Sequence, residues 1–323
     1  MIANQLVHRF AVLTSFMTFL LLCAGALVTS TGSGLAVPDW PLSFGMYMPP
    51  MVGGVFFEHG HRMVAGTVGI MMAVLCVLLW VSEPRRWVKV LGTIALGAVV
   101  TQAVLGGMTV LYRLPTAVSV SHACLAQFFF SLTTVISLVT SRFWLRPMEP
   151  LANDNGKLVS LPALAAMTAV GFFLQLLMGA VMRHTGSGLA IPDFPLAFGR
   201  VVPEEFSFSI GIHYAHRVGA FVMVALTATL VIRIVKHHAN HLALVTVAGL
   251  LSAALAFQFM LGASVIWLKR PIPLTTAHLA VGALCLASSV CLTVLACRLK
   301  GYFYWGTAWQ SSLRDLSWQA KGV

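Results

Sequence analysis

Charged residues are scarce in this 323-residue sequence. Asp, Glu, Lys and Arg together make up 9% of it, whereas 59% of the residues are hydrophobic. A soluble domain has about 25% charged residues. The chain therefore has too little polar surface to fold in water, and its composition predicts an integral membrane protein.

Acidic residues are the scarcer kind, with nine against twenty basic residues and a net charge of +11. Such an excess of positive charge also occurs in nucleic-acid-binding proteins. Here the basic residues form short groups between apolar runs, a pattern that sets the orientation of membrane helices. The charge pattern thus argues against nucleic-acid binding.

Long stretches without any charge divide the chain into eight segments. A membrane-spanning helix needs about 20 apolar residues. Seven stretches are long enough, and the eighth, 218–232, is short, so we expect its helix to begin upstream near Phe208. The seven lie at 10–38, 63–82, 90–112, 114–141, 158–182, 237–268 and 271–297.

The distribution of Lys and Arg predicts the orientation. With both termini in the cytoplasm, thirteen of these residues lie on the inner side and seven on the outer side. Positive residues favour the cytoplasmic side. We therefore expect a multi-pass protein of the cell inner (cytoplasmic) membrane, with both long loops, 29–57 and 183–206, outside.

The second half of the chain repeats the first. Residues 31–45 (TGSGLAVPDWPLSFG) and 185–199 (TGSGLAIPDFPLAFG) match at twelve of fifteen positions, at an offset of 154. Later matches continue at offsets of 155 and 156. The sequence therefore predicts an all-α membrane fold of eight transmembrane helices, built as two tandem four-helix bundles related by a pseudo-two-fold axis along the membrane normal. The expected units are 1–150 and 151–323, with residues 142–157 as an inner linker.

Four histidines recur as two pairs, His61 with His122 and His216 with His278. Each lies near the outer end of an even-numbered span, so we expect the four imidazoles at one depth. Two imidazoles on parallel helices can bind the iron of a porphyrin from both faces. A single histidine at this depth is more often a polar cap, but polar groups inside a membrane are costly, and the duplication favours iron ligation.

The residues next to the histidines differ in one respect between the halves. Arg62 and Arg217 follow the first histidine of each pair and suit porphyrin propionates, although a lone arginine there commonly lies at the headgroups. Glu58 precedes His61 by three residues, whereas His213 occupies the equivalent place in the second half. The carboxylate is otherwise an ordinary helix-end interaction. The asymmetry favours a reactive first half and an electron-carrying second half.

The EHGHR motif at 58–62, the TGSGL-x-x-PDWPL loop, the paired histidines and the repeat together resemble the heme A synthase family. This resemblance covers nearly the whole chain. It implies a membrane oxidoreductase that oxidises a methyl group of heme O to the formyl group of heme A for terminal oxidase maturation, with heme B as cofactor. It also implies that heme O arrives from a heme O synthase and that a terminal oxidase or its assembly factors take the product. The oligomeric state, a homo-oligomer or a single chain, is left open by the sequence.

The resemblance also assigns roles to individual residues. Glu58 matches the catalytic glutamate of the family, His61 and His122 match the ligands of the substrate heme, and His216 and His278 match the heme B ligands. The first unit would then be the catalytic unit and the second the heme B unit.

Cysteines are absent from the outer loops, where many bacterial members of that family have a disulfide pair. Val37 and Ser43 occupy the corresponding positions. All six cysteines lie in apolar spans, where a buried thiol acts as a small hydrophobic group. We therefore expect a mechanism without an oxidised thiol pair in the outer loop.

Two other functions use parts of the same pattern. A di-heme b-type electron-transfer cytochrome needs the four histidines but has no use for a carboxylate in one half only. A transporter with a histidine proton relay would bind no heme. The electron acceptor and the source of the formyl oxygen are left open by the sequence.

Overall fold

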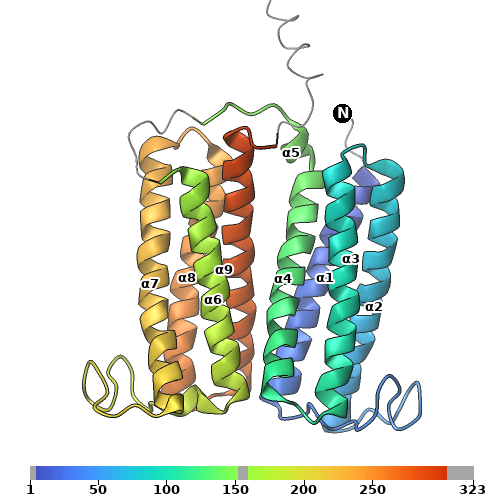
Figure 1. The fold of residues 1–323 in the computed structure, drawn as a ribbon, viewed down its shortest axis with the longest axis vertical. Coiled ribbons are helices and arrows are strands. Elements are labelled where there is room, and N and C mark those ends of the chain that lie inside the picture. Colours follow the sequence, from blue (N-terminus) through green and yellow to red (C-terminus); the bar gives the residue numbers. More distant parts are fainter. Residues whose placement is uncertain (1–4, 152–158, 304–323) are drawn as a thin grey trace, which may run out of the picture.

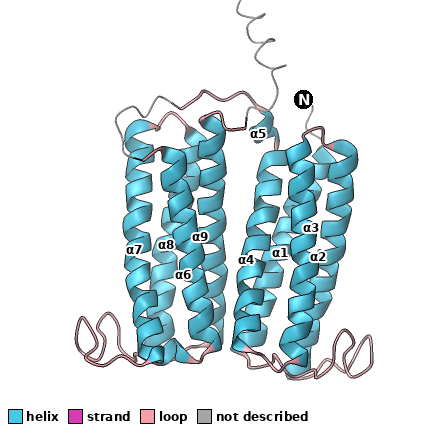
Figure 2. Cartoon of the chain, in the orientation of Figure 1, coloured by secondary structure: helices cyan, strands magenta, loops and turns pink. Residues whose placement is uncertain are grey.

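The computed structural model describes residues 5–151 and 159–303, and this part of the chain consists of helices joined by loops, two of which are long (Figure 2). Three of the basic residues counted on the inner side, Lys157, Arg314 and Lys321, lie outside it. The elements are α1 (Gln5–Ser30), α2 (Gly54–Ser82), α3 (Arg86–Leu111), α4 (Thr116–Thr140), α5 (Arg142–Leu145), α6 (Leu161–His184), η1 (Ser187–Leu189), α7 (Phe208–His237), α8 (Leu242–Trp267) and α9 (Ile272–Leu299).

Eight of the described helices are long and apolar enough to cross a membrane, as the sequence predicts. Helices suit this solvent because each backbone N–H and C=O finds its partner within the same segment. The helix with the short apolar run does begin at Phe208, where the Ser207 hydroxyl accepts a hydrogen bond from the backbone N–H of Ile210. The all-α membrane fold is therefore confirmed.

The spanning helices form two groups of four (Figure 1). Helices α1–α4 contact one another in a ring, and α6–α9 do the same. Between the groups, α1 and α4 pack against α6 and α9. In keeping with this central place, α4 and α9 are the most buried spans, at 50% and 56% of their apolar windows. The arrangement agrees with two tandem units, whereas the symmetry axis and the boundary at residue 150 stay predictions.

Small residues bring the two groups together. Ala283 and Ala287 of α9 form a buried cluster with Leu22 of α1 and Phe130 of α4. Close approach through small side chains is the usual means of helix association in membranes. At the end of α6, the Arg183 guanidinium donates hydrogen bonds to the Ala26 carbonyl at 2.9 Å and the Ser30 hydroxyl at 2.7 Å, both on α1.

Both long loops lie at one end of the molecule, and the start of α1 lies at the opposite end (Figure 1). The loops share one local structure. The carboxylate of Asp39 accepts hydrogen bonds from the backbone N–H groups of Phe44 and Gly45, and Asp193 does the same 154 residues later. These bonds hold the pKa of Asp39 and Asp193 below the ordinary value of 3.8. Each loop therefore has an anionic anchor at neutral pH.

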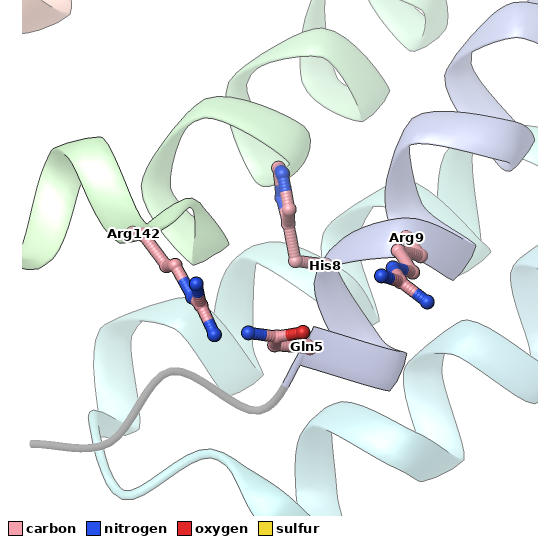
Figure 3. Close-up of a pocket in the computed structure, with 4 residues that line it drawn as sticks. All are labelled: Gln5, His8, Arg9 and Arg142. Carbon is pink, nitrogen blue, oxygen red and sulfur yellow. The ribbon is translucent and has the colours of Figure 1, made fainter.

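A pocket lies at the end away from the long loops. Its lining residues are polar or basic, namely Gln5, His8, Arg9 and Arg142. The side chains of Gln5 and Arg142 point toward each other across the pocket (Figure 3). Arginines at this level commonly extend toward the polar headgroups of the bilayer. The four repeated histidines lie near the other end, so this pocket is separate from the site described next.

Candidate active site

The four repeated histidines lie at similar depths from the end that carries the long loops. His61, His122, His216 and His278 are the eighth, seventh, ninth and seventh residues of α2, α4, α7 and α9. At 1.5 Å of rise per residue, this depth is about 10–14 Å along each helix. All four side chains are partly buried. The four histidines therefore lie at similar positions along their helices, whereas their depth in a membrane stays a prediction.

A glycine on the preceding helix faces each imidazole. A Cβ atom added at Gly25, Gly106, Gly179 or Gly262 would lie 3.1–3.2 Å from the ring Cε1 of His61, His122, His216 or His278, respectively. Such a distance is tighter than ordinary van der Waals contact. These four glycines thus make room for the rings.

The imidazoles of the second unit face each other with their ring centres 6.5 Å apart. The ring planes lie at 68° to each other, and a separation of this size leaves room for one metal ion between two ring nitrogens. A ring nitrogen of His61, His122 and His278 is buried without a partner among the described residues.

Paired imidazoles are the axial donor set of a porphyrin iron, whereas a free metal ion in a protein usually takes four or more ligands. Residues 5–151 and 159–303 contain no group of three or more His, Cys, Asp or Glu side chains suited to such an ion. The buried nitrogens, the four glycines and the donor type therefore fit two iron porphyrins, one in each unit.

Glu58 is buried, with 4% of its surface exposed, and its two oxygens have different partners. Oε2 accepts a hydrogen bond from the backbone N–H of Val37 at 2.8 Å, and Oε1 forms an ion pair with the Arg62 guanidinium at 2.6 Å. The carboxylate thus joins the first long loop to α2, one helical turn from His61.

His213 takes the same structural place in the second unit. Its Nδ1 accepts a hydrogen bond from the backbone N–H of Ile191 at 3.2 Å, and Ile191 is the counterpart of Val37. Glu58 and His213 therefore both hold the long loop of their unit. The two units differ at this position in charge and not in architecture.

Arg62 and Arg217 also repeat one another. Arg62 donates a hydrogen bond to the Leu42 carbonyl at 2.9 Å, and Arg217 donates to the equivalent Leu196 carbonyl at 2.9 Å and to the Ile191 carbonyl at 2.9 Å. Each guanidinium group thus anchors the long loop of its unit. Propionate binding stays a prediction for both, and the loop contacts are a role that the sequence pattern does not reveal.

A family model described as COX15-CtaA, cytochrome oxidase assembly protein, matches residues 52–290. The chain belongs to the COX15-CtaA family. Within that match lie Glu58, all four repeated histidines and both arginines. The family resemblance inferred from the sequence is therefore confirmed.

Curated relatives of this COX15-CtaA protein carry the name Heme A synthase. The protein from Halalkalibacterium halodurans is 29% identical over 303 residues, which cover 88% of this chain and 95% of the relative. The protein from Shouchella clausii is 30% identical over 265 residues, which cover 80% of this chain and 86% of the relative. A Bacillus cereus protein is 27% identical over 306 residues, or 92% of this chain and 95% of the relative.

Two features of this COX15-CtaA site were missed by the sequence reasoning. The His59 ring, buried beside Glu58, has its Nδ1 2.8 Å from the Ser43 hydroxyl, so the first loop has a further contact with α2. Gly25 and Gly179 were also missed, although their common offset of 154 and their places before His61 and His216 could have revealed them. All six cysteines are free thiols and lie in the spanning helices, not in the long loops.

Proposed function

We propose that this protein is a heme A synthase, which oxidises a methyl group of heme O to the formyl group of heme A. Membership of the COX15-CtaA family and the names of its relatives support this activity. The observation that carries the proposal further is the pair Glu58 and His213, because the same structural position has a carboxylate in only one unit.

The first unit, residues 1–150, is proposed as the catalytic unit. His61 and His122 bind the iron of heme O from opposite faces, which fixes the macrocycle relative to Glu58. The Glu58 carboxylate, held by Arg62 and by the loop backbone, places negative charge at the edge of this site. A fixed charge in a site of low dielectric stabilises positive charge that develops on a nearby carbon, or accepts its proton.

The second unit, residues 151–323, is proposed to bind heme B through His216 and His278, with Arg217 beside it. When bound, heme B supplies one-electron redox chemistry. Conversion of the methyl group to the aldehyde, through an alcohol, would take two successive two-electron oxidations and one added oxygen atom. With water as the source of that atom, four electrons and four protons would be released. The electrons would leave the first unit by way of the second and pass to an external acceptor.

The remaining assignments follow from the same function. Heme O is expected from a heme O synthase, and heme A passes to a terminal oxidase or its assembly factors. Eight spans place the protein in a membrane. The distribution of basic residues supports the cell inner membrane, with cytoplasmic termini and heme sites near the outer face.

The test is to purify the protein from cells that supply heme O, record its absorption spectrum and identify the extracted hemes. We expect a low-spin heme B signal together with heme O or heme A. Replacement of His216 or His278 by Ala should remove the heme B signal, and an unchanged low-spin spectrum in both variants would contradict the ligand assignment. Heme without any heme A formation would favour the di-heme cytochrome, and absence of heme would favour the transporter.

A further inference from the structure

The pocket at the end away from the long loops lies where α1 meets the junction of α4 and α5. Gln5, His8 and Arg9 line it from the first turns of α1, and Arg142, the first residue of α5, lines it from the other side (Figure 3). The His8 ring is held at α4, because its Nδ1 lies 3.4 Å from the Thr140 hydroxyl. The pocket is therefore built between two parts of the first unit that lie far apart in the sequence.

The two guanidinium groups of the pocket have no acidic partner among the described residues. Arg9 and Arg142 are exposed, and the ion pairs of the described chain involve neither of them. Arg142 has a neutral neighbour instead. When the Gln5 amide is turned so that its oxygen faces Arg142, this oxygen accepts hydrogen bonds from the guanidinium group. The pocket therefore brings together two positive charges that no described carboxylate neutralises.

The second unit has no such pocket at the equivalent place. Arg298 is the counterpart of Arg142, 156 residues later in the sequence. Its guanidinium lies over the Trp144 ring, 4.5 Å from the ring centre, and donates a hydrogen bond to the Arg146 carbonyl at 2.7 Å. Residues of the linker thus cover the arginine of the second unit. The counterparts of the three α1 residues, at the offset of 154, are apolar, namely Val159, Pro162 and Ala163.

A phosphate group fits the pocket in charge and in size. Guanidinium groups bind phosphate oxygens through paired, charge-assisted hydrogen bonds. The cavity has a volume of about 200 Å³, several times the ~30 Å³ that one water molecule takes up in the liquid. Next to Gln5 and Arg142 in the sequence, Leu6 and Phe143 are exposed apolar residues. The surroundings therefore suit an amphiphile, with its phosphate in the pocket and its acyl chains along the helices.

We propose that this pocket binds a phosphate group, and that in the membrane this phosphate belongs to the headgroup of an anionic phospholipid. Basic pockets between membrane helices on the cytoplasmic side bind anionic headgroups, and the distribution of Lys and Arg predicts that this end is cytoplasmic. The bound headgroup would join α1 to the α4–α5 junction through Arg9 and Arg142. The site is separate from the repeated histidines, so it does not depend on the proposed function.

The experiment titrates the purified full-length protein, stripped of lipid in a neutral detergent, with one of three probes. These are dioleoyl phosphatidylglycerol, dioleoyl phosphatidylcholine and inorganic phosphate, and native mass spectrometry measures the bound molecules. We expect saturable binding of phosphatidylglycerol and weaker binding of phosphatidylcholine, whose choline group neutralises its phosphate. Tighter binding of phosphatidylglycerol than of inorganic phosphate assigns the ligand to the lipid. Equal binding of these two probes assigns a phosphate from solution.

Variants show whether the pocket is the binding site. Arg9→Gln and Arg142→Gln should each lower the affinity for phosphatidylglycerol about fivefold, and the double variant about 25-fold, as expected for basic residues at an anionic lipid surface. Arg86→Gln is the matched control, because it removes one positive charge from the start of α3, outside the pocket. It should leave the affinity unchanged.

Two results would overturn the proposal. One is an equal loss of affinity in Arg86→Gln and in the pocket variants, which would indicate general attraction to a basic surface. The other is the absence of saturable binding of both anionic probes to the wild type. Circular dichroism should show the same helical content in each variant as in the wild type. Arg9→Gln changes an exposed side chain, so its comparison with Arg86→Gln keeps the test decisive if Arg142→Gln fails to fold.

Discussion

Replacing Glu58 by His is the sharpest test of the catalytic assignment, because the protein already uses His at the equivalent position 213. There the imidazole accepts a hydrogen bond from the backbone N–H of Ile191, the counterpart of the Val37 N–H that donates to Glu58 Oε2 in the first unit. The Glu58→His variant should therefore keep the first loop on α2 while it removes the carboxylate. It changes the charge of the site and preserves its architecture.

The structural cost of this change can be bounded from the contacts of Arg62. Removing one partner of a buried ion pair costs about 3–5 kcal/mol when the other charge is left uncompensated. Arg62 retains three loop carbonyls as acceptors, those of Val37, Asp39 and Leu42. We therefore expect the free energy of unfolding to fall by ~1–3 kcal/mol, the cost of leaving a buried hydrogen-bonding group without a partner. The variant should fold and bind its hemes.

The catalytic cost should be larger. Loss of one preorganised electrostatic contact to a transition state typically lowers the rate by about 10²–10³-fold. We expect heme A formation to fall by that factor, with heme O or its alcohol derivative accumulating. The assay is chromatography of hemes extracted from cells that supply heme O, normalised to the heme content of the purified protein.

Two companion variants complete this test. Glu58→Gln keeps the shape and one acceptor oxygen and should lose activity to a similar extent. His213→Gln, the matched change in the second unit, should be much milder. Near-normal heme A formation by Glu58→His would refute the reasoning, because the carboxylate would then serve only to hold the loop.

Three further predictions concern the remaining parts of the site. Gly179→Ala should perturb or abolish the low-spin spectrum, because the new methyl group would lie 3.2 Å from the His216 ring, whereas Gly249→Ala, where nothing lies within 4 Å, should leave the spectrum unchanged. Hydrogen bonds from the backbone N–H groups of Gly45 and Phe44 lower the pKa of Asp39 in the folded protein. The Asp39 carboxylate therefore stabilises the loop fully above pH 3.8, its ordinary pKa, and this stabilisation is lost as the pH falls through the lowered pKa. Hydrogen exchange at the Gly45 amide should report this loss, and an Asp39→Asn variant should show no such transition. Thiol reductants that act on the outer face should leave turnover unchanged, and loss of activity with hemes still bound would contradict the free-thiol state of the six cysteines.

The fold was largely predictable because lipid imposes simple rules on sequence. Uncharged runs locate the spans, and even the upstream start of the short run at Phe208 followed from the length that a bilayer demands. The repeat then predicted corresponding positions in the two units, including the common depth of His61 and His216.

The partners of the polar side chains were less predictable. The sequence placed Glu58 beside His61 from helical periodicity, but its contact with Val37 depends on the path of a loop 21 residues earlier. Likewise, the anchoring of the loop by Arg62 and the Ser43–His59 contact arise from tertiary folding that periodicity does not describe.

The bonds of Arg183 constrain how this molecule can move. Its guanidinium belongs to α6 of the second unit but holds the Ala26 carbonyl of α1, and Ala26 adjoins the glycine that faces His61. Sliding or rotation of one unit against the other would break this bond at the level of the repeated histidines. In the proposed function, the mobility needed for substrate entry should therefore reside within the first unit, in its own long loop and helix ends, rather than between the two proposed heme sites.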